Sequence, residues 1–318
     1  MSSMGHSIPG SGQEAGQLAR PGIIPTIWGG LSVSPDAGGR VWRGLRSNRL
    51  LLVAVILAMV IAGLALIVPL LPLQDPLATD YDHTLQAPGK GHVLGTDLHG
   101  RDVLSRVLWA SRPSLLVGVI ATSLALLAGI AAGGLASMGG RFTDAFLMRV
   151  ADAFLSFPAI LGAIAIMAVL GPGLRNVFFA IAVFGWPVFA RLFRSSVLAT
   201  REMDYVKAAR VLGASGTTVF IRHILPNSIT PVLAYTALAA AAAILAEAGL
   251  SFINLGVQRP EPSWGLMLAE SRGLFEQAPW MAVAPGVAVT VTTIIFIMIG
   301  SAVSRPMAPV VAGEGRSS

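Results

Sequence analysis

The sequence of 318 residues contains no cysteine, which excludes disulfides, iron–sulfur clusters and cysteine-ligated zinc sites. Charged residues are also scarce, at 12% of the chain, against about 25% in an average soluble domain. Only two lysines occur, Lys90 and Lys207, and neither lies in the G-x-x-x-x-G-K-[ST] motif that binds ATP phosphates. Because 54% of the residues are hydrophobic, the composition predicts a membrane protein that binds no cofactor of its own.

Histidine supplies no recognisable metal-binding motif. His92 and His99 are the closest approach to one, but the further ligands that a metal requires are missing, so we predict no metal site. The run from Gly213 to Gly216 matches the G-x-S-G of rhomboid intramembrane serine proteases, with Ser215 as the nucleophile. Such a serine needs a membrane-buried histidine as its base, whereas the nearest histidine, His223, lies in the same polar stretch. An intramembrane protease therefore stays only as an alternative.

Six uncharged or nearly uncharged segments predict transmembrane helices. The first runs from Leu50 to Val68, a rise of about 28 Å at 1.5 Å per residue, and two prolines follow it. The second and fifth are rich in alanine and glycine, which lets neighbouring helices approach closely. The fourth is short and broken at Gly185-Trp186-Pro187. The predicted fold class is thus an all-α membrane protein, with later spans at 114–138, 145–170, 176–190, 228–250 and 281–304.

Arginine is distributed unevenly around these segments. A cluster precedes the first span, and most other basic residues fall on the same side, so the positive-inside rule places both termini in the cytoplasm. The same rule accounts for the net charge of +6, and we expect no nucleic-acid binding. An ion pair between Arg149 and Asp152 is expected near the inner end of the third span. The predicted organisation is a mostly disordered cytoplasmic tail (1–49), a first transmembrane helix (50–72), an extracytoplasmic loop (73–113), a five-helix core (114–304) with a cytoplasmic loop (198–227), and a cytoplasmic tail (305–318).

The longest polar interruption in the C-terminal two-thirds of the chain runs from Glu202 to Asn227. Its pattern predicts a helix over 203–212, which Gly213 ends in a conformation with positive φ. Ser215 is expected to cap a second helix, and Pro226 to end it. On the first helix, spacing at i, i+3, i+4 and i+7 gathers four apolar side chains on one face that needs a surface to bury against, namely Tyr205, Ala208, Ala209 and Leu212.

A second polar stretch, residues 94–106, reads LGTDLHGRDVLSR. Asp97 or Thr96 can cap a helix start. An apolar stripe then opposes a polar one, which predicts an amphipathic helix lying on the outer face of the membrane. We interpret it as a structural surface helix, with ligand contact as the alternative. The motif positions are Gly95, Thr96, Asp97, Gly100, Arg101, Asp102, Ser105 and Arg106.

One acid, Glu247, lies within the fifth span, less than two turns from its outer end. An ionisable residue inside a span is a functional hypothesis by default. We interpret Glu247 as structural or interfacial, with substrate contact as the alternative.

Both polar stretches resemble a known family. Ala208-Ala209, followed by Gly213 and later by Leu225-Pro226, resembles the "EAA" cytoplasmic loop of permease subunits in ABC importers, although the family's glutamate is Lys207 here. The run from Arg222 to Asn227, with His223 in place of the usual isoleucine, and the GTDxxGRDxxSR pattern at 94–106 are similar to the C-type permeases of the dipeptide, oligopeptide and nickel branch. The resemblance marks the loop positions Tyr205, Lys207, Ala208, Ala209, Arg210, Leu212, Gly213, Ala214, Ser215, Arg222, His223, Leu225 and Pro226.

This resemblance implies the type I importer permease fold, in which the loop is a coupling helix that docks on the ATP-hydrolysing subunit. The implied partners are a second, B-type permease, one or two P-loop ATPases that bind ATP and magnesium, an extracytoplasmic substrate-binding protein, and membrane lipid. The implied function is import of di- or oligopeptides across the cytoplasmic (inner) membrane, with no catalysis by this chain. A nickel permease of the same branch is one alternative. A secondary transporter is another alternative, for which we would expect charged residues near the middle of the membrane.

Overall fold

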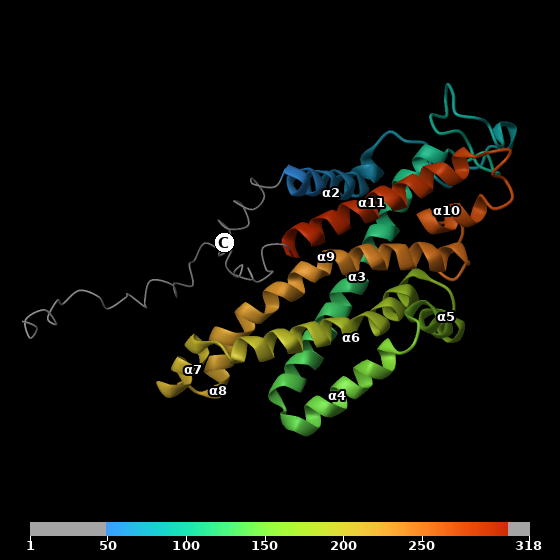
Figure 1. The fold of residues 1–318 in the computed structure, drawn as a ribbon. Helices are drawn as coiled ribbons and strands as arrows, with labels where there is room; N and C mark the ends of the chain where they lie inside the picture. The colour runs from blue at the N-terminus through green and yellow to red at the C-terminus, as the bar shows by residue number, and fades with distance from the viewer. Residues whose placement is uncertain (1–48, 305–318) are drawn as a thin grey trace, which may run out of the picture. The chain divides into compact units, whose positions relative to one another are not determined.

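The computed structural model describes residues 49–304, so the predicted tails lie outside the described residues. Five helices in this range are long and apolar enough to cross a membrane, or six if one bent pair forms a single span (Figure 1). The described chain is therefore an all-helical membrane protein. In order, its elements are α2 (Arg49–Ile67), η2 (Val68–Leu70), η3 (Tyr81–His83), α3 (Val103–Met138), α4 (Gly140–Leu155), α5 (Ala159–Leu170), α6 (Leu174–Arg201), α7 (Asp204–Val211), α8 (Gly216–Val219), η4 (Phe220–Ile224), α9 (Leu225–Phe252), α10 (Trp264–Glu270) and α11 (Trp280–Ser304).

Helix α3 begins earlier than the sequence predicts and is continuous over 36 residues. Its cap is Asp102, whose side chain accepts a hydrogen bond from the N–H of Ser105, so the prediction of a cap at Asp97 or Thr96 is wrong. The separate amphipathic surface helix is also wrong, because residues 103–106 form the first turn of the long α3 and their polar side chains are buried. Pro113, inside α3, does not interrupt it.

The predicted third span is two helices instead of one. Helices α4 and α5 meet at a bend of 88°. Pro158 caps the start of α5, and a proline both lacks an N–H and disfavours the α conformation in the residue before it, which explains the break. The predicted second and third spans leave a connection over 139–144, which in the structure is only the Gly139–Gly140 junction; Gly140 there has a φ of +82°. The expected Arg149–Asp152 pair is replaced by ion pairs from Asp152 and Asp144 to Arg191 and Arg194 of α6.

Helix α6 is unbroken over 28 residues, so the break predicted at Gly185-Trp186-Pro187 is wrong. Close packing against α3 surrounds this part of α6. A Cβ on Gly129 of α3 would collide with Phe189 and would lie 2.9 Å from the carbonyl oxygen of Trp186. Helix α6 is thus continuous although Pro187 removes one of its backbone hydrogen bonds.

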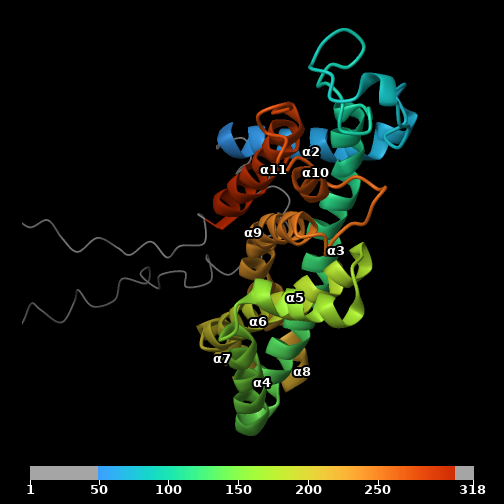
Figure 2. The same ribbon diagram turned by 90° about the vertical axis from the view of Figure 1, so that its right-hand side faces the viewer.

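The polar stretch between α6 and α9 contains α7, α8 and the π-helix η4. Pro226 does not end a helix as predicted, because α9 continues directly from the π-helix η4 and Pro226 lies in its first turn. The run from Gly216 to Phe252 is consequently one candidate span. In both ribbon views, α7 and α8 lie at the opposite end of the helices from α10 (Figures 1 and 2).

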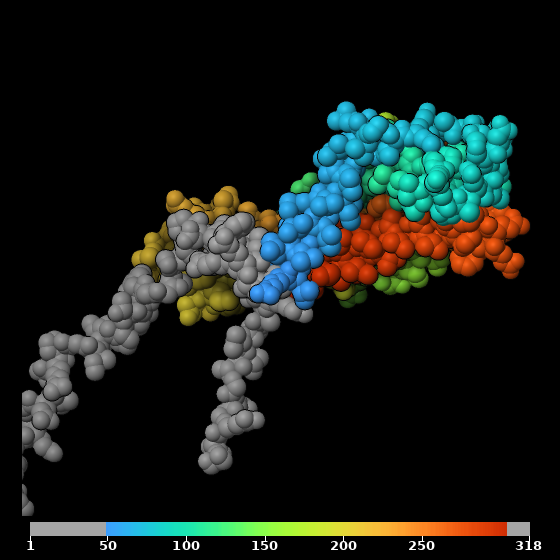
Figure 3. All heavy atoms as spheres, turned by 90° about the horizontal axis from the view of Figure 1, so that it is seen from above, coloured from blue at the N-terminus to red at the C-terminus, as the bar shows by residue number. Residues whose placement is uncertain are grey.

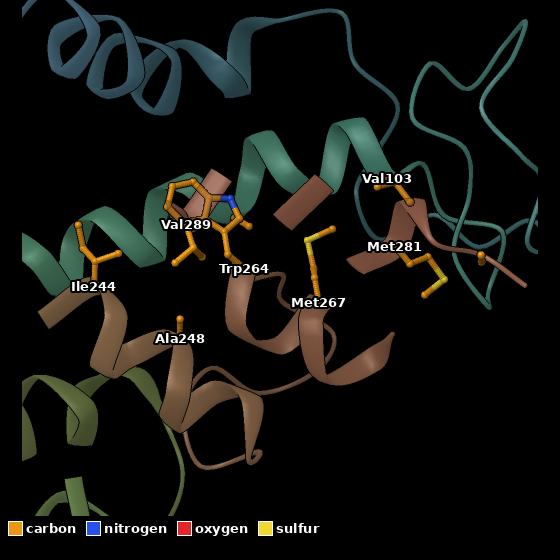
Figure 4. Packing of buried hydrophobic residues seen from close by; sticks show 9 residues of the cluster. Val103, Ile244, Ala248, Trp264, Met267, Met281 and Val289 are labelled. Carbon is orange, nitrogen blue, oxygen red and sulfur yellow. The ribbon is translucent and has the colours of Figure 1, made fainter. Parts of the chain in front are cut away.

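A hydrophobic cluster joins α3, α9, α10 and α11 near the end that carries α10. Figure 4 shows Ile244 and Ala248 of α9 and Trp264 and Met267 of α10 projecting toward α3. The indole N–H of Trp264 donates to the carbonyl of Val107 in α3 at 3.0 Å. Alanines of α9 are buried against neighbouring helices, as its small-residue composition predicts. Short helix α10, inside the predicted outer loop, was not anticipated.

Candidate functional site

The loop that contains α7 and α8 is held against α6 by buried apolar side chains. Val206 of α7 and Val219 of α8 are fully buried and pack with Phe193 and Val197 of α6. Tyr205 is half-buried, and the partial burial of its ring raises the pKa of its hydroxyl. These contacts fix both short helices on the end of α6.

The outward surface of the same loop is apolar. The side chains of Val211 and Leu212 are 87% and 86% exposed, and Ala208 is exposed beside them. The prediction that Tyr205, Ala208, Ala209 and Leu212 form one face in need of a surface therefore fits only in part. Tyr205 and Ala209 pack against the hydrophobic cluster of this chain, whereas Ala208 and Leu212 are exposed. Val211 and Leu212 thus form an exposed apolar tip of the loop, which is typical of a surface that binds another protein.

The turn between α7 and α8 has the predicted chemistry. Gly213 has a φ of +84°, and its N–H donates to the carbonyl of Arg210 at 3.0 Å. Ser215 caps α8 by accepting a hydrogen bond from the N–H of Thr218 at 3.3 Å, and its hydroxyl lies 2.8 Å from that of Thr218. The serine of the G-x-S-G run is thus a helix cap on an exposed loop. Lys207, where the resembled family has glutamate, forms an exposed ion pair with Glu202 at 3.2 Å.

The motif at residues 94–106 forms a buried network of charges instead of a solvated face. Arg106 is 1% exposed, and its guanidinium bonds Glu270 of α10 at 2.9 Å. Arg101 bonds Asp97 at 2.6 Å and reaches the same Glu270 at 3.4 Å. A third guanidinium, from Arg259, meets the other oxygen of Glu270 at 3.1 Å. In the space-filling view, the segment between α2 and α3 lies against the segment of α10 and α11 (Figure 3).

The remaining motif residues shape the loop that carries these charges. One oxygen of Asp97 accepts the N–H groups of His99 and Arg101, at 2.8 and 3.0 Å. Gly100 has a φ of +72°, and a Cβ there would collide with the carbonyl of Asp80. The hydroxyl of Ser105 donates to the carbonyl of Gln74 at 2.5 Å. These contacts explain the residue types of the motif: they fix the shape of the chain segment that precedes α3.

The two histidines considered as metal ligands are engaged in this anchor. His92 pairs with Asp102 at 3.1 Å, and His99 lies 3.3 Å from the guanidinium of Arg101. Within residues 49–304, no group of three or more side chains has the arrangement of a metal site.

Glu247 is fully buried, so the interfacial interpretation is wrong and the structural one fits its contacts. Ser251 donates a hydrogen bond to one carboxylate oxygen at 2.6 Å, and Ser114 of α3 donates to the other at 3.2 Å. Glu247 thereby joins α9 to α3.

Sequence reasoning missed several residues of these sites. Glu270 is separated from Arg106 by 164 positions, so no local pattern links them. Val206 and Val211 were overlooked because helical spacing was counted from Tyr205, and each valine is one position away from a residue of that set. The serines around Glu247 have no signal beyond their being polar residues near predicted span ends.

Together, several membrane-spanning helices, a buried polar network at one end and an exposed apolar loop at the other define a multi-pass membrane protein built to work with partners. Family models agree with this class. A model of the binding-protein-dependent transport system inner membrane component matches residues 125–309, and one of the N-terminal transmembrane domain of oligopeptide transport permease C matches residues 38–88.

Named relatives cover most of the chain. The dipeptide transport system permease protein DppC of Alkalihalophilus pseudofirmus is 38% identical over 84% of this chain and 88% of its own length. A putative peptide transport system permease of Brucella abortus is 39% identical, with 86% and 92% covered. The glutathione transport system permease GsiD of Escherichia coli is 35% identical, with 93% and 95% covered.

A solved structure, the inward-facing MetNI methionine ABC transporter, aligns with 64% of this chain and 94% of its own, at 16% identity and a TM-score of 0.49. The chain belongs to the family of binding-protein-dependent transport system inner membrane components. It is accordingly a non-catalytic permease component of an ABC importer, a multi-pass protein of the inner membrane. This outcome confirms the resemblance drawn from the sequence.

Proposed function

We propose that this chain is the C-type permease of an ATP-driven importer of di- and oligopeptides. It would form the translocation path together with a second, B-type permease, each with its termini in the cytoplasm. One or two separate P-loop ATPases would bind ATP and magnesium, and an extracytoplasmic binding protein would deliver the peptide. Relatives named for dipeptide, peptide and glutathione transport support this substrate class, since glutathione is itself a tripeptide.

The observation that carries the proposal is the anchored loop with an apolar tip. Burying an exposed valine or leucine side chain contributes roughly 1.5–3 kcal/mol, so Val211 and Leu212 favour a partner surface at this end. Val206 and Val219 hold the loop on α6, while α8 continues through η4 into α9. A force applied to the tip would therefore act on two candidate spans. In this proposal the ATPase supplies that force.

Two substitutions test this coupling role. Ala208 is exposed, so Ala208→Asp adds a charge that the isolated chain tolerates but a docked partner does not, because burying an unpaired charge costs several kcal/mol. Around Gly213, a Cβ would meet no atom within 4 Å. Gly213→Arg then costs only about 1–2 kcal/mol of backbone strain within the chain, while it places a bulky cation at the contact.

The expected result is loss of peptide uptake by the assembled importer, with the ATPase lost from the purified complex or no longer stimulated by substrate. Gly213→Asn is the matched control, because asparagine adopts positive φ more readily and adds little bulk. Its uptake should stay near that of the unmodified protein. Uptake and ATPase co-purification at full level in Ala208→Asp and Gly213→Arg would overturn the coupling role. Parallel uptake of a labelled dipeptide, a tripeptide and Ni²⁺ separates peptide from nickel transport.

A further inference from the structure

A cavity of about 540 Å³ opens beside the outer charged network, between α3, the turn that precedes α6, and the segment 257–262. Its volume is within the range of roughly 300–1,000 Å³ that is typical of small-molecule sites. Trp109, Leu116 and Leu174 give it apolar walls, whereas Arg112 and Glu261 bring opposite charges to its lining.

These two charges are available to a ligand. Arg259, the other cation of the cavity, is already paired with Glu270. Arg112 and Glu261, by contrast, have no ion-pair partner among residues 49–304, and they are not paired with each other. The guanidinium of Arg112 is instead held over the ring of Trp109, 5.6 Å from its centre. One spare cation and one spare anion therefore line the same apolar hollow.

We propose that this cavity is an entry site for zwitterionic peptides, in which Arg112 binds the C-terminal carboxylate and Glu261 the N-terminal ammonium group. Charge complementarity selects this occupant. A purely anionic ligand would be repelled by Glu261, and a purely cationic one by Arg112. The apolar walls accept peptide side chains of varied shape, which suits an importer of short peptides. The inference rests on the proposed function and adds to it a location on this chain where substrate first makes contact.

The test measures binding without the binding protein, which selects peptides by itself. The complete importer, with both permeases and its ATPases, is placed in nanodiscs of phosphatidylcholine and phosphatidylglycerol. Trialanine, its N-acetylated form and its C-terminal amide are titrated while tryptophan emission is followed. Trp109→Phe identifies the signal from the cavity among the six tryptophans of the chain. Because the charges are exposed, each blocked terminus should weaken binding by at most about fivefold.

Substitutions at Arg112 and Glu261 show which residue binds which terminus of the peptide. Arg112→Gln should bind the free acid and the amide equally while it still prefers the free amine, and Glu261→Gln should show the reverse. Arg112→Lys should retain the preference for the free acid. Arg175→Gln is the matched control, since Arg175 is an exposed arginine near the start of α6 that does not line the cavity; it should keep both preferences.

Several outcomes would overturn the entry site. These are equal binding of free and blocked peptides by the unmodified importer, preferences unchanged in Arg112→Gln and Glu261→Gln, or loss of the signal when phosphatidylethanolamine, whose headgroup carries a primary ammonium group like the N-terminus of a peptide, enters the nanodisc. Uptake by the unmodified importer with its binding protein in proteoliposomes keeps the two proposals apart. Uptake without terminus-dependent binding refutes the entry site alone, and absence of peptide uptake refutes the proposed function.

Discussion

Glu270 is the acid that contacts all three arginines of the network around residues 94–106, and its removal should destabilise that end of the protein. Its carboxylate accepts bonds from Arg106, Arg101 and Arg259. In Glu270→Ala, two buried guanidinium groups would be left to share Asp97. The Nε of Arg106 lies 3.5 Å from Asp97 without forming a hydrogen bond to it, so Asp97 compensates poorly.

The expected loss of folding free energy follows from the burial of the ion pairs that Glu270 forms. Removing one partner of a buried ion pair typically costs about 3–5 kcal/mol, while the exposed contact to Arg259 adds at most about 1 kcal/mol. We expect Glu270→Ala to lower the thermal midpoint of the purified complex and to expose the segment between α2 and α3 to protease. Glu276→Ala is the control, because Glu276 is an exposed acid a few residues further along the same connection. Equal midpoints and equal proteolysis in the two variants would refute the argument.

Two further predictions concern topology and packing. Ser215→Cys provides the only thiol in a chain that lacks cysteine, and an impermeant maleimide should label it only after the cells are permeabilised; labelling in intact cells would reverse the orientation. Ala241→Leu should reduce the yield of assembled complex through overpacking of about 1–3 kcal/mol, because Ala241 is buried in α9, whereas Leu at exposed Ala242 should not; equal yields would contradict the packing.

Features that depend on local chemistry were predictable from the sequence. A glycine that ends a helix needs no distant partner, and Gly213 has the positive φ that was expected. Ser215 caps a helix because its hydroxyl reaches an N–H three residues ahead. The positions of long apolar segments were also predictable, since a span must supply a continuous apolar surface to lipid.

Proline shows why the breaks were less predictable. Pro158 stands at a genuine bend, Pro187 lies within an unbroken helix, and Pro226 begins a helix that it was expected to end. The residue is the same in each case, and what differs is its surroundings. Close packing of α6 on Gly129 surrounds the site of Pro187, and a preceding π-helix leads into Pro226. Such compensation comes from tertiary contacts that local propensity does not contain.

The outer motif was interpreted as a solvated face for a related reason. A polar stripe with arginine and aspartate opposite an apolar stripe is typical of a surface helix when no partner is known. Their partner, Glu270, belongs to the short helix α10, which has little apolar periodicity of its own. A buried charge is acceptable only where a counter-charge meets it. The burial of Arg106 therefore depended on a contact that only the folded chain reveals.

The two ends of the molecule differ in what they leave unsatisfied, and this difference bears on function. At the end that carries α10, the charges of the 94–106 motif are paired within the chain and need no partner from another protein. At the other end, apolar side chains of the α7–α8 loop stay exposed and are free to pack against a partner protein. Helix α9 connects the two ends: it continues from α8 through η4, and near its far end Glu247 bonds Ser114 and Ser251. Displacing the loop must therefore either carry α9 along, and with it the contacts of Glu247, or bend the chain at η4, where the α-helical hydrogen-bond pattern is already altered.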